Sequence, residues 1–185
     1  GNGKPYRIQY RGDGDVRFNL HTTSDANYNL DASGLLDDDE WTHLVSVYDG
    51  ANTAIYKNGL QVESGSLTGS LVASNDEFLV GSNNQEDSFL AGFVDDVRIY
   101  SRALSATEIK KLYNSGQATY QKTTDSDRFT DGLVGHWTFD GGTITGTTVE
   151  DVSPSGSSAT TIGEAGTFSS AADGGWTTVN FTNSY

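Results

Sequence analysis

The chain has 185 residues and a formal net charge of −14, from 25 acidic and 11 basic side chains. This charge repels phosphate backbones and anionic lipids, which argues against nucleic acid partners and membrane-surface binding. No apolar run approaches the roughly 18–20 residues of a spanning helix, so membrane insertion is not expected. The absence of Cys excludes disulfides and thiolate chemistry. With 22 Gly, 2 Pro and 11% aromatic residues, the composition favours an all-β protein.

The sequence contains no Met and opens on Gly1. A complete translated chain begins with Met, so we expect a processed product or a piece of a longer polypeptide. The lack of a signal sequence is therefore uninformative.

Alternating apolar and polar residues predict a first hairpin. Tyr6–Tyr10 and Val16–Leu20 both alternate, and a Gly/Asp turn cluster over residues 11–15 separates them. The polar stretch that follows is interpreted as loop. A third strand is predicted over residues 41–48, with Trp41 and His43 on the same face as Val45 and Val47.

The strongest hairpin signal is the pair Asn58 and Gly59 between residues 53–57 and 60–63, because Asn-Gly accepts a positive φ at both central positions. Residues 78–81 and 92–100 supply two more predicted strands. The short spacing between strands is typical of an antiparallel β-sandwich. One short helix is predicted near 105–114, where Ser105 and Glu108 form a capping box.

The composition changes after this helix. Residues 119–131 are polar and are interpreted as a linker. A new strand is predicted over residues 132–140 and another over residues 176–181. The predicted domain organisation is thus a sandwich over residues 1–118, a linker over 119–131 and a second set of strands over 132–185.

Several of these segments resemble a known family. WTHLVSVYDG over residues 41–50, the YKNG hairpin over 56–59 and GFVDDVRIYSRALS over 92–105 resemble the latter half of a laminin-G-like, concanavalin A-like jelly roll. GLVGHWTFD over residues 132–140 is similar to the opening strand of another copy, and GWTTVNFTNSY over 175–185 is similar to the start of H-type-lectin-like modules. The resemblance implies that residues 1–118 form the C-terminal part of such a domain.

The resemblance also implies that residues 1–118 lack the domain's opening strands, which would leave sheet edges unpaired. Three ways to fill the gap stay open. Residues 133–139 fold back beside residues 94–100, a neighbouring chain supplies the strand, or the chain is the retained part of a larger protein. Residues 132–185 accordingly either begin a second copy or complete the first sandwich.

Catalytic motifs are not found. His21, His43 and His136 have no metal-ligand spacing, and neither a Gly-x-Ser-x-Gly elbow nor a zincin motif occurs. Asp95 and Asp96 are expected to point to opposite faces of one strand, which prevents a glycosidase-like carboxylate pair. Pairing of Asp96 with Arg98 is the simpler interpretation. We expect a protein that is not an enzyme.

Calcium is the ion that this acidic sequence suits best, because hard cations take several oxygen ligands, and the resemblance implies it as well. Acidic and amide residues gather over residues 37–40, 75–77 and 83–87. The predicted ligands are Asp140 and Asp151, because in the resembled family the opening strand and the loop after it commonly meet near the sheet rim.

A glycan site needs an aromatic side chain flanked by amides, because sugars stack their apolar faces and hydrogen-bond at their edges. Two predicted loops offer this mixture. The predicted ligand-binding residues are Tyr28, Asn27, Asn29, Asn83, Asn84 and Phe89. Trp41 and Trp137 are expected in the core instead.

The resemblance implies a non-catalytic module at the cell surface or outside the cell, for adhesion or carbohydrate recognition in a multi-module protein. Its partners would be a glycan or a cell-surface protein. Two alternatives stay open. One is a structural subunit or spacer of an extracellular filament, completed by strand exchange with neighbouring copies of itself. The other is the ancillary binding domain of a glycoside hydrolase.

Overall fold

A computed structural model describes residues 4–38, 40–74, 78–82, 90–117, 130–139, 144–145, 148–154, 156, 159–160, 168–170 and 177–179. The chain divides into two compact units, described separately below: unit 1 takes residues 1–76 and 102–124, and unit 2 takes residues 77–101 and 125–185. No helix among the described residues is long and apolar enough to cross a membrane.

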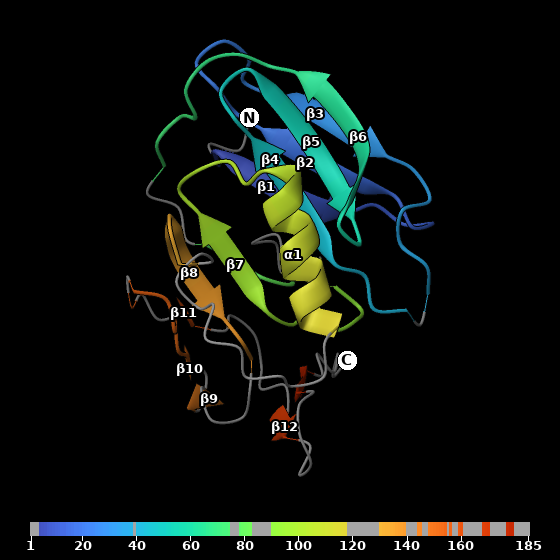
Figure 1. Cartoon of the computed structure of the whole chain (residues 1–185), viewed down its shortest axis with the longest axis vertical. Helices are drawn as coiled ribbons and strands as arrows, with labels where there is room; N and C mark the ends of the chain where they lie inside the picture. The colour runs from blue at the N-terminus through green and yellow to red at the C-terminus, as the bar shows by residue number, and fades with distance from the viewer. Residues whose placement is uncertain are drawn as a thin grey trace. The chain divides into compact units, whose positions relative to one another are not determined.

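Unit 1 consists of two three-stranded antiparallel sheets and a helix (Figure 1). Its elements are β1 (Tyr6–Tyr10), β2 (Val16–Leu20), β3 (Tyr28–Ala32), β4 (Leu44–Tyr48), β5 (Asn52–Lys57), β6 (Leu60–Ser66) and α1 (Ala106–Gln117). One sheet has the order β1-β2-β3 and the other β4-β5-β6, and β3 lies against β5 and β6.

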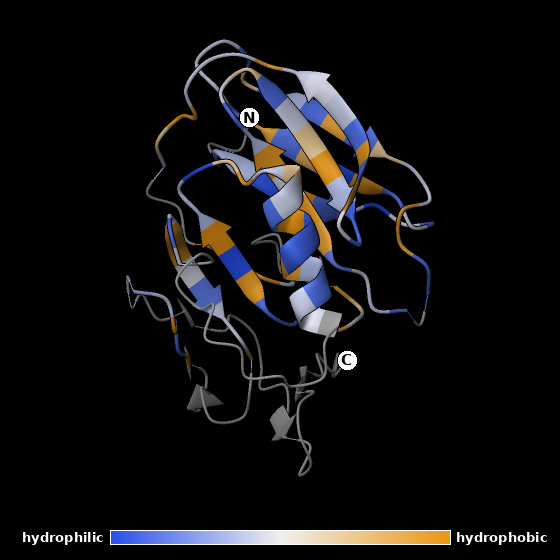
Figure 2. Cartoon of the chain, in the orientation of Figure 1, coloured by the Kyte–Doolittle hydropathy of each residue, from blue (hydrophilic) through white to orange (hydrophobic). Residues whose placement is uncertain are grey.

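The two sheets enclose one hydrophobic core. Hydrophobic and hydrophilic residues are interspersed along the strands of unit 1 (Figure 2). In β1, β2 and β3 they alternate strictly, so each of these strands has one apolar face. Leu20 and Ile55 are fully buried and come from the two opposing sheets. The other buried members of the core are Val16, Phe18, Leu30, Ala32, Leu35 and Leu67. The predicted antiparallel β-sandwich is confirmed.

Both predicted hairpin turns form. Arg11 N–H donates to the Asp15 carbonyl over 2.9 Å, and φ is positive at residues 12, 13 and 14. Asn58 and Gly59 have φ of 52° and 79°, the left-handed geometry expected of an Asn-Gly turn. The main-chain N–H of Asn58 donates to the His43 carbonyl over 2.9 Å, which closes the end of the second sheet.

The core does not extend under β1. Tyr6, Ile8 and Tyr10 lie opposite Leu20, Phe18 and Val16, so they share the inner face of their sheet. Their neighbours on β2 are buried, yet these three side chains are 37%, 49% and 48% exposed. This uncovered apolar row of Tyr6, Ile8 and Tyr10 is here called the β1 row.

The structure adds β3, where the sequence indicated a loop. Leu30 and Ala32 point into the core while Asn29 and Asp31 alternate with them on the other face. The prediction failed because the segment has no β-branched residue and lies within a polar stretch, which obscured its apolar–polar alternation. Tyr28 and Asn29 therefore belong to a strand, not to a loop.

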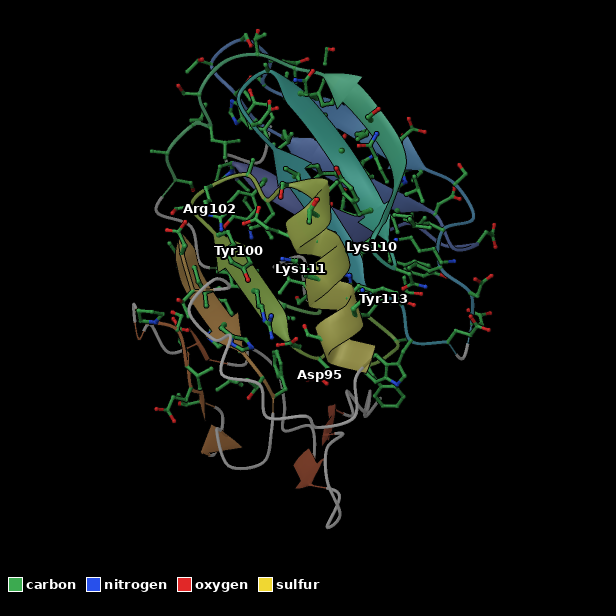
Figure 3. All side chains as sticks on the ribbon, viewed as in Figure 1. Asp95, Tyr100, Arg102, Lys110, Lys111 and Tyr113 are labelled. Carbon is green, nitrogen blue, oxygen red and sulfur yellow. The ribbon has the colours of Figure 1, made fainter. Side chains whose placement is uncertain are left out.

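The predicted helix is confirmed as α1 and begins with the expected cap. Ser105 N–H donates to Glu108 Oε2 over 2.8 Å, and Glu108 N–H donates to Ser105 Oγ over 3.3 Å. Lys110 and Tyr113 on α1 (Figure 3) contact the turn at Gly59, and the Tyr113 ring lies 5.9 Å from that of His43.

Unit 2 is built from short strands. They are β7 (Val97–Tyr100), β8 (Leu133–Trp137), β9 (Ile144–Thr145), β10 (Thr148–Val149), β11 (Ala159–Thr160), β12 (Phe168–Ser170) and β13 (Thr177–Val179). β8 pairs antiparallel with β7, so residues 133–137 lie beside residues 97–100. This pairing does not decide between a second copy and a completed first sandwich, and the domain boundaries stay a prediction.

Two strand predictions in unit 2 need correction. Residues 78–81 form no strand, and the strand predicted over 92–100 begins only at Val97. Asp96 has a φ of 52°, a left-handed conformation that cannot continue a pleated strand. Of the predicted linker, only Thr130 and Asp131 lie among the described residues.

Candidate functional site

Polar side chains cover the outer face of the β1-β2-β3 sheet, because each strand turns its alternate apolar residues inward. Two rows cross the three strands: Arg7 is opposite Asn19, which is opposite Asn29, and Gln9 is opposite Arg17, which is opposite Asp31. We call these six residues the polar face: Arg7, Gln9, Arg17, Asn19, Asn29 and Asp31. Its donors and acceptors are fixed on rigid strands.

The Asn19 side chain organises one end of the polar face. It is only 8% exposed, and its Nδ2 donates to Asn27 Oδ1 and Asn29 Oδ1 over 3.0 Å each and to the Tyr28 carbonyl over 3.1 Å. Asn29 Nδ2 in turn donates to the Asn27 carbonyl over 3.1 Å. The exposed amides of Asn27 and Asn29 are thereby held in fixed positions.

An ion pair occupies the second row. Arg17 Nε donates to Asp31 Oδ1 over 2.6 Å and Arg17 Nη2 donates to Asp31 Oδ2 over 2.7 Å. The hydrogen bond from Arg17, helped by the positive charges of Arg17 and Arg11, lowers the pKa of the Asp31 carboxyl. Asp31 is therefore a carboxylate at neutral pH, and Arg17 is oriented by it.

The sequence-predicted glycan residues divide into three groups. Asn27 and Asn29 are brought together at the polar face, as just described. Tyr28 points the other way: it packs against the core, and its hydroxyl contacts Gly65. Asn83, Asn84 and Phe89 lie outside the described residues.

Most of the polar face was missed by sequence reasoning. Arg7, Gln9 and Arg17 occupy the polar positions of two strands that the sequence does predict. Reading both faces of those strands, rather than the apolar one alone, would have found them. Asp31 required the third strand, which the sequence did not indicate.

The predicted calcium ligands are only partly described. Asp140 lies outside the described residues. Asp151 is 4% exposed, and its Oδ1 accepts hydrogen bonds from the His136 N–H over 2.9 Å and the Ser153 N–H over 2.8 Å. Within the described part of the chain, no three His, Asp or Glu side chains are grouped as a metal site. Asp151 thus supplies one carboxylate and joins β8 to the loop after β10.

A second ionic cluster lies beside β7 in unit 2. Asp96 Oδ1 and His136 Nε2 are 2.5 Å apart, and Arg98 Nη2 is 2.9 Å from Asp96 Oδ2. The predicted pairing of Asp96 with Arg98 is confirmed, although the two acids at 95 and 96 precede the strand and do not lie within it. Burial raises the pKa of Asp96, but the hydrogen bond from His136 and the charge of Arg98 outweigh it and lower that pKa overall.

The two tryptophans assigned to the core differ. Trp137 is 7% exposed and stacks on Phe78 with ring centroids 5.2 Å apart. Trp41 is 55% exposed, so its prediction was wrong. The reason is that β4 begins only at Leu44, which leaves Trp41 outside the alternation that buries core side chains.

Comparison with curated proteins gives no match. One solved structure is similar, that of an S-layer domain-containing protein from Clostridium thermocellum, with 26% sequence identity and a TM-score of 0.40. That match covers 61% of this chain and 59% of the other. The laminin G family model described as the concanavalin A-like lectin/glucanases superfamily matches residues 1–110. With its antiparallel sandwich and this match over more than half of its length, the chain belongs to the concanavalin A-like lectin/glucanases superfamily.

Proposed function

We propose that this protein is a non-catalytic extracellular or cell-surface module that recognises carbohydrate through the polar face. The observation that carries the proposal is the pair of cross-strand rows in which amides and an ion pair lie side by side on one rigid sheet. Family membership is consistent with it but does not decide the ligand.

The chemistry of the polar face suits sugars. Sugar hydroxyls both donate and accept hydrogen bonds, and the face offers amides with both functions, guanidinium donors and a carboxylate acceptor. Neighbouring strands lie about 4.8 Å apart, so consecutive residues of a row are spaced on the scale of a sugar ring. Because Asn19 and Asp31 already hold their neighbours in place, little ordering entropy would be lost on binding.

The proposal is tested on the intact 185-residue protein by a glycan array followed by calorimetry on the best ligand. Asn29→Ala removes an exposed amide from the polar face and should weaken binding at least about fivefold. Asn114→Ala removes an exposed amide from α1 and should change nothing. Melting temperatures establish that both variants fold. Equal binding by the two variants, or no glycan binding by the parent protein, would overturn the proposal.

Assembly with copies of itself is a second candidate function, favoured by the β1 row. Uncovered apolar side chains on the inner face of a sheet are a surface that another chain's strand can bury. Ile8→Lys places a charge in this row and should abolish any concentration-dependent association seen by light scattering. A protein that is monomeric at all concentrations would remove this candidate.

A calcium ion at Asp140 and Asp151 is a further part of the proposal, supported by the buried carboxylate of Asp151. Calcium titration should raise the melting temperature of the parent protein and leave that of Asp151→Asn unchanged. Asp151 also accepts two main-chain hydrogen bonds, so Asp151→Asn can lower the melting temperature without any calcium. The comparison is therefore between the melting-temperature changes that calcium causes in each protein. An equal rise in both proteins would count against these ligands.

The same binding activity would suit an ancillary domain of a glycoside hydrolase. A glycoside hydrolase domain encoded in the same gene would support that role. If the gene encodes none, the proposed role in adhesion or carbohydrate recognition is favoured.

A further inference from the structure

A small hollow adjoins the polar face where β2 and β3 meet the hairpin turn. Its volume is about 170 Å³, and its lining residues are Arg11, Asp15, Val16, Arg17, Asp31 and Ser33. Two hydrogen bonds from main-chain N–H groups brace its walls: that of Arg11 donates to the Asp15 carbonyl over 2.9 Å, and that of Gly34 donates to the Asp15 side-chain Oδ1 over 2.8 Å. The hollow is thus formed by the fold before any ligand arrives.

Several polar groups in the hollow have unused capacity. Within the described part of the chain, the Arg11 guanidinium and the Ser33 hydroxyl make no hydrogen bond. Asp15 uses Oδ1 for Gly34, which leaves Oδ2 as an acceptor. Arg17 is already engaged by Asp31, so the cation available to a ligand is Arg11.

We propose that this hollow binds the carboxylate of an acidic sugar, such as a uronic acid, and so sets the ligand class of the polar face. The inference rests on the proposed carbohydrate-binding function. A guanidinium can bind a carboxylate by two parallel charge-assisted hydrogen bonds, and Arg11, which lines the hollow, carries such a group. Ser33 and Asp15 would bond to ring hydroxyls.

Charge and size restrict the ligand further. Two arginines and two aspartates line the hollow, so its formal charge is balanced. A balanced site in a protein of net charge −14 favours a monoanion rich in hydroxyls over a phosphate dianion. The volume is below the roughly 300–1,000 Å³ of drug-sized sites, which fits a single sugar ring.

The test is a titration of the intact protein with sodium glucuronate and, separately, with glucose, followed by amide chemical shifts in NMR spectra. Glucuronate should bind about tenfold more tightly than glucose, because a charged hydrogen bond is added. Arg11→Gln should remove this preference, because the affinity for glucuronate falls with loss of the guanidinium. Lys110→Gln, which removes the same charge from an exposed position on α1, should keep the preference.

The outcomes separate this inference from the proposed function. Equal affinities for glucuronate and glucose, or a preference that survives Arg11→Gln, would overturn the inference while sugar binding sensitive to Asn29→Ala still stands. The inference would also be overturned if neither sugar changed the amide chemical shifts. In that case a positive glycan array would still support carbohydrate binding by the polar face. A glucuronate polymer compared with free glucuronate distinguishes a chain ligand from a single sugar. Arg11→Lys, which keeps the charge but loses the paired donors, should retain only part of the preference.

Discussion

Arg17 and Asp31 face each other across β2 and β3 and are joined by two hydrogen bonds of 2.6 and 2.7 Å. The pair occupies the row next to that of Asn19 and Asn29, and both of its residues line the hollow at Arg11. Its first consequence is positional: Asp31 holds the Arg17 guanidinium in one orientation, so the outer surface keeps its shape without a ligand.

The Arg17–Asp31 pair should contribute little to stability. The two side chains are 25% and 51% exposed, and exposed pairs contribute about 0.2–1 kcal/mol. A double-mutant cycle with Arg17→Gln and Asp31→Asn, measured by urea unfolding, should give a coupling free energy in that range. Because the folded pKa of Asp31 is lowered, the coupling is complete above the unfolded pKa and declines as the pH falls below it. A coupling above about 2 kcal/mol would contradict this view of an exposed pair.

Glu108 should make α1 sensitive to acid. Hydrogen bonds from Arg102 and then from Ser105 lower the pKa of Glu108 from 4.5 to about 2. The carboxylate therefore stabilises the fold fully above pH 4.5, and this contribution declines as the pH falls from 4.5 towards about 2. Glu108→Gln should lower the melting temperature at pH 7, and the gap to the parent protein should narrow at pH 3.

Glu40→Gln is the control for Glu108, because Glu40 is exposed and makes no hydrogen bond to another described residue. Its melting temperature should follow that of the parent protein at both pH values. A gap for Glu108→Gln that stays constant between pH 7 and pH 3 would refute the assigned role of the cap.

Gly59 should tolerate substitution less well than Gly34. Both have a positive φ, 79° and 60°, so Ala at either costs about 1 kcal/mol in backbone strain. A β-carbon at Gly59 would also lie 3.2 Å from Lys110 Cα and 3.3 Å from Tyr113 Cβ, whereas nothing lies within 4 Å at Gly34. Gly59→Ala should thus lower the free energy of unfolding more than Gly34→Ala does in parallel urea titrations. Equal losses of unfolding free energy in the two variants would mean that α1 shifts to accommodate the added β-carbon without a measurable cost.

Asp96 should stabilise unit 2 in two separable ways. Asp96→Asn removes the charge that pairs with Arg98 but keeps a residue type that adopts a left-handed backbone readily. Asp96→Ala removes the charge and adds backbone strain. Melting temperatures should fall in the order parent, Asp96→Asn, Asp96→Ala. If the two variants melt together, the backbone conformation contributes nothing measurable.

Local signals were sufficient for much of the fold. The alternation in Tyr6–Tyr10 and Val16–Leu20, the turn at Gly59 and the cap at Glu108 each depend on a few neighbouring residues. The interactions that stabilise these elements lie between residues that are close in the sequence, so the sequence predicts them. The segment with Leu30 and Ala32 also alternates, but it is short, has no β-branched residue and lies within a polar stretch, so the strand becomes evident only from its pairing with β2.

The binding surface was less predictable, because it depends on strand register. Arg17 and Asp31 are 14 residues apart, and only the pairing of β2 with β3 brings them together. Asn27 and Asn29 were found from their amide chemistry, but the buried amide of Asn19 that holds them was not. Tyr28 was selected as an aromatic neighbour of amides, yet the strand period turns it to the opposite face.

The β1 row should make β1 the strand of its sheet that opens most easily. The inner side chains of β1 are solvent-exposed, so this strand buries little apolar surface. Detaching β1 from β2 should therefore cost less free energy of local unfolding than detaching a central strand. The main-chain amides of β1 should accordingly exchange with deuterium sooner than those of β2 and β5, through local fraying and not through global unfolding.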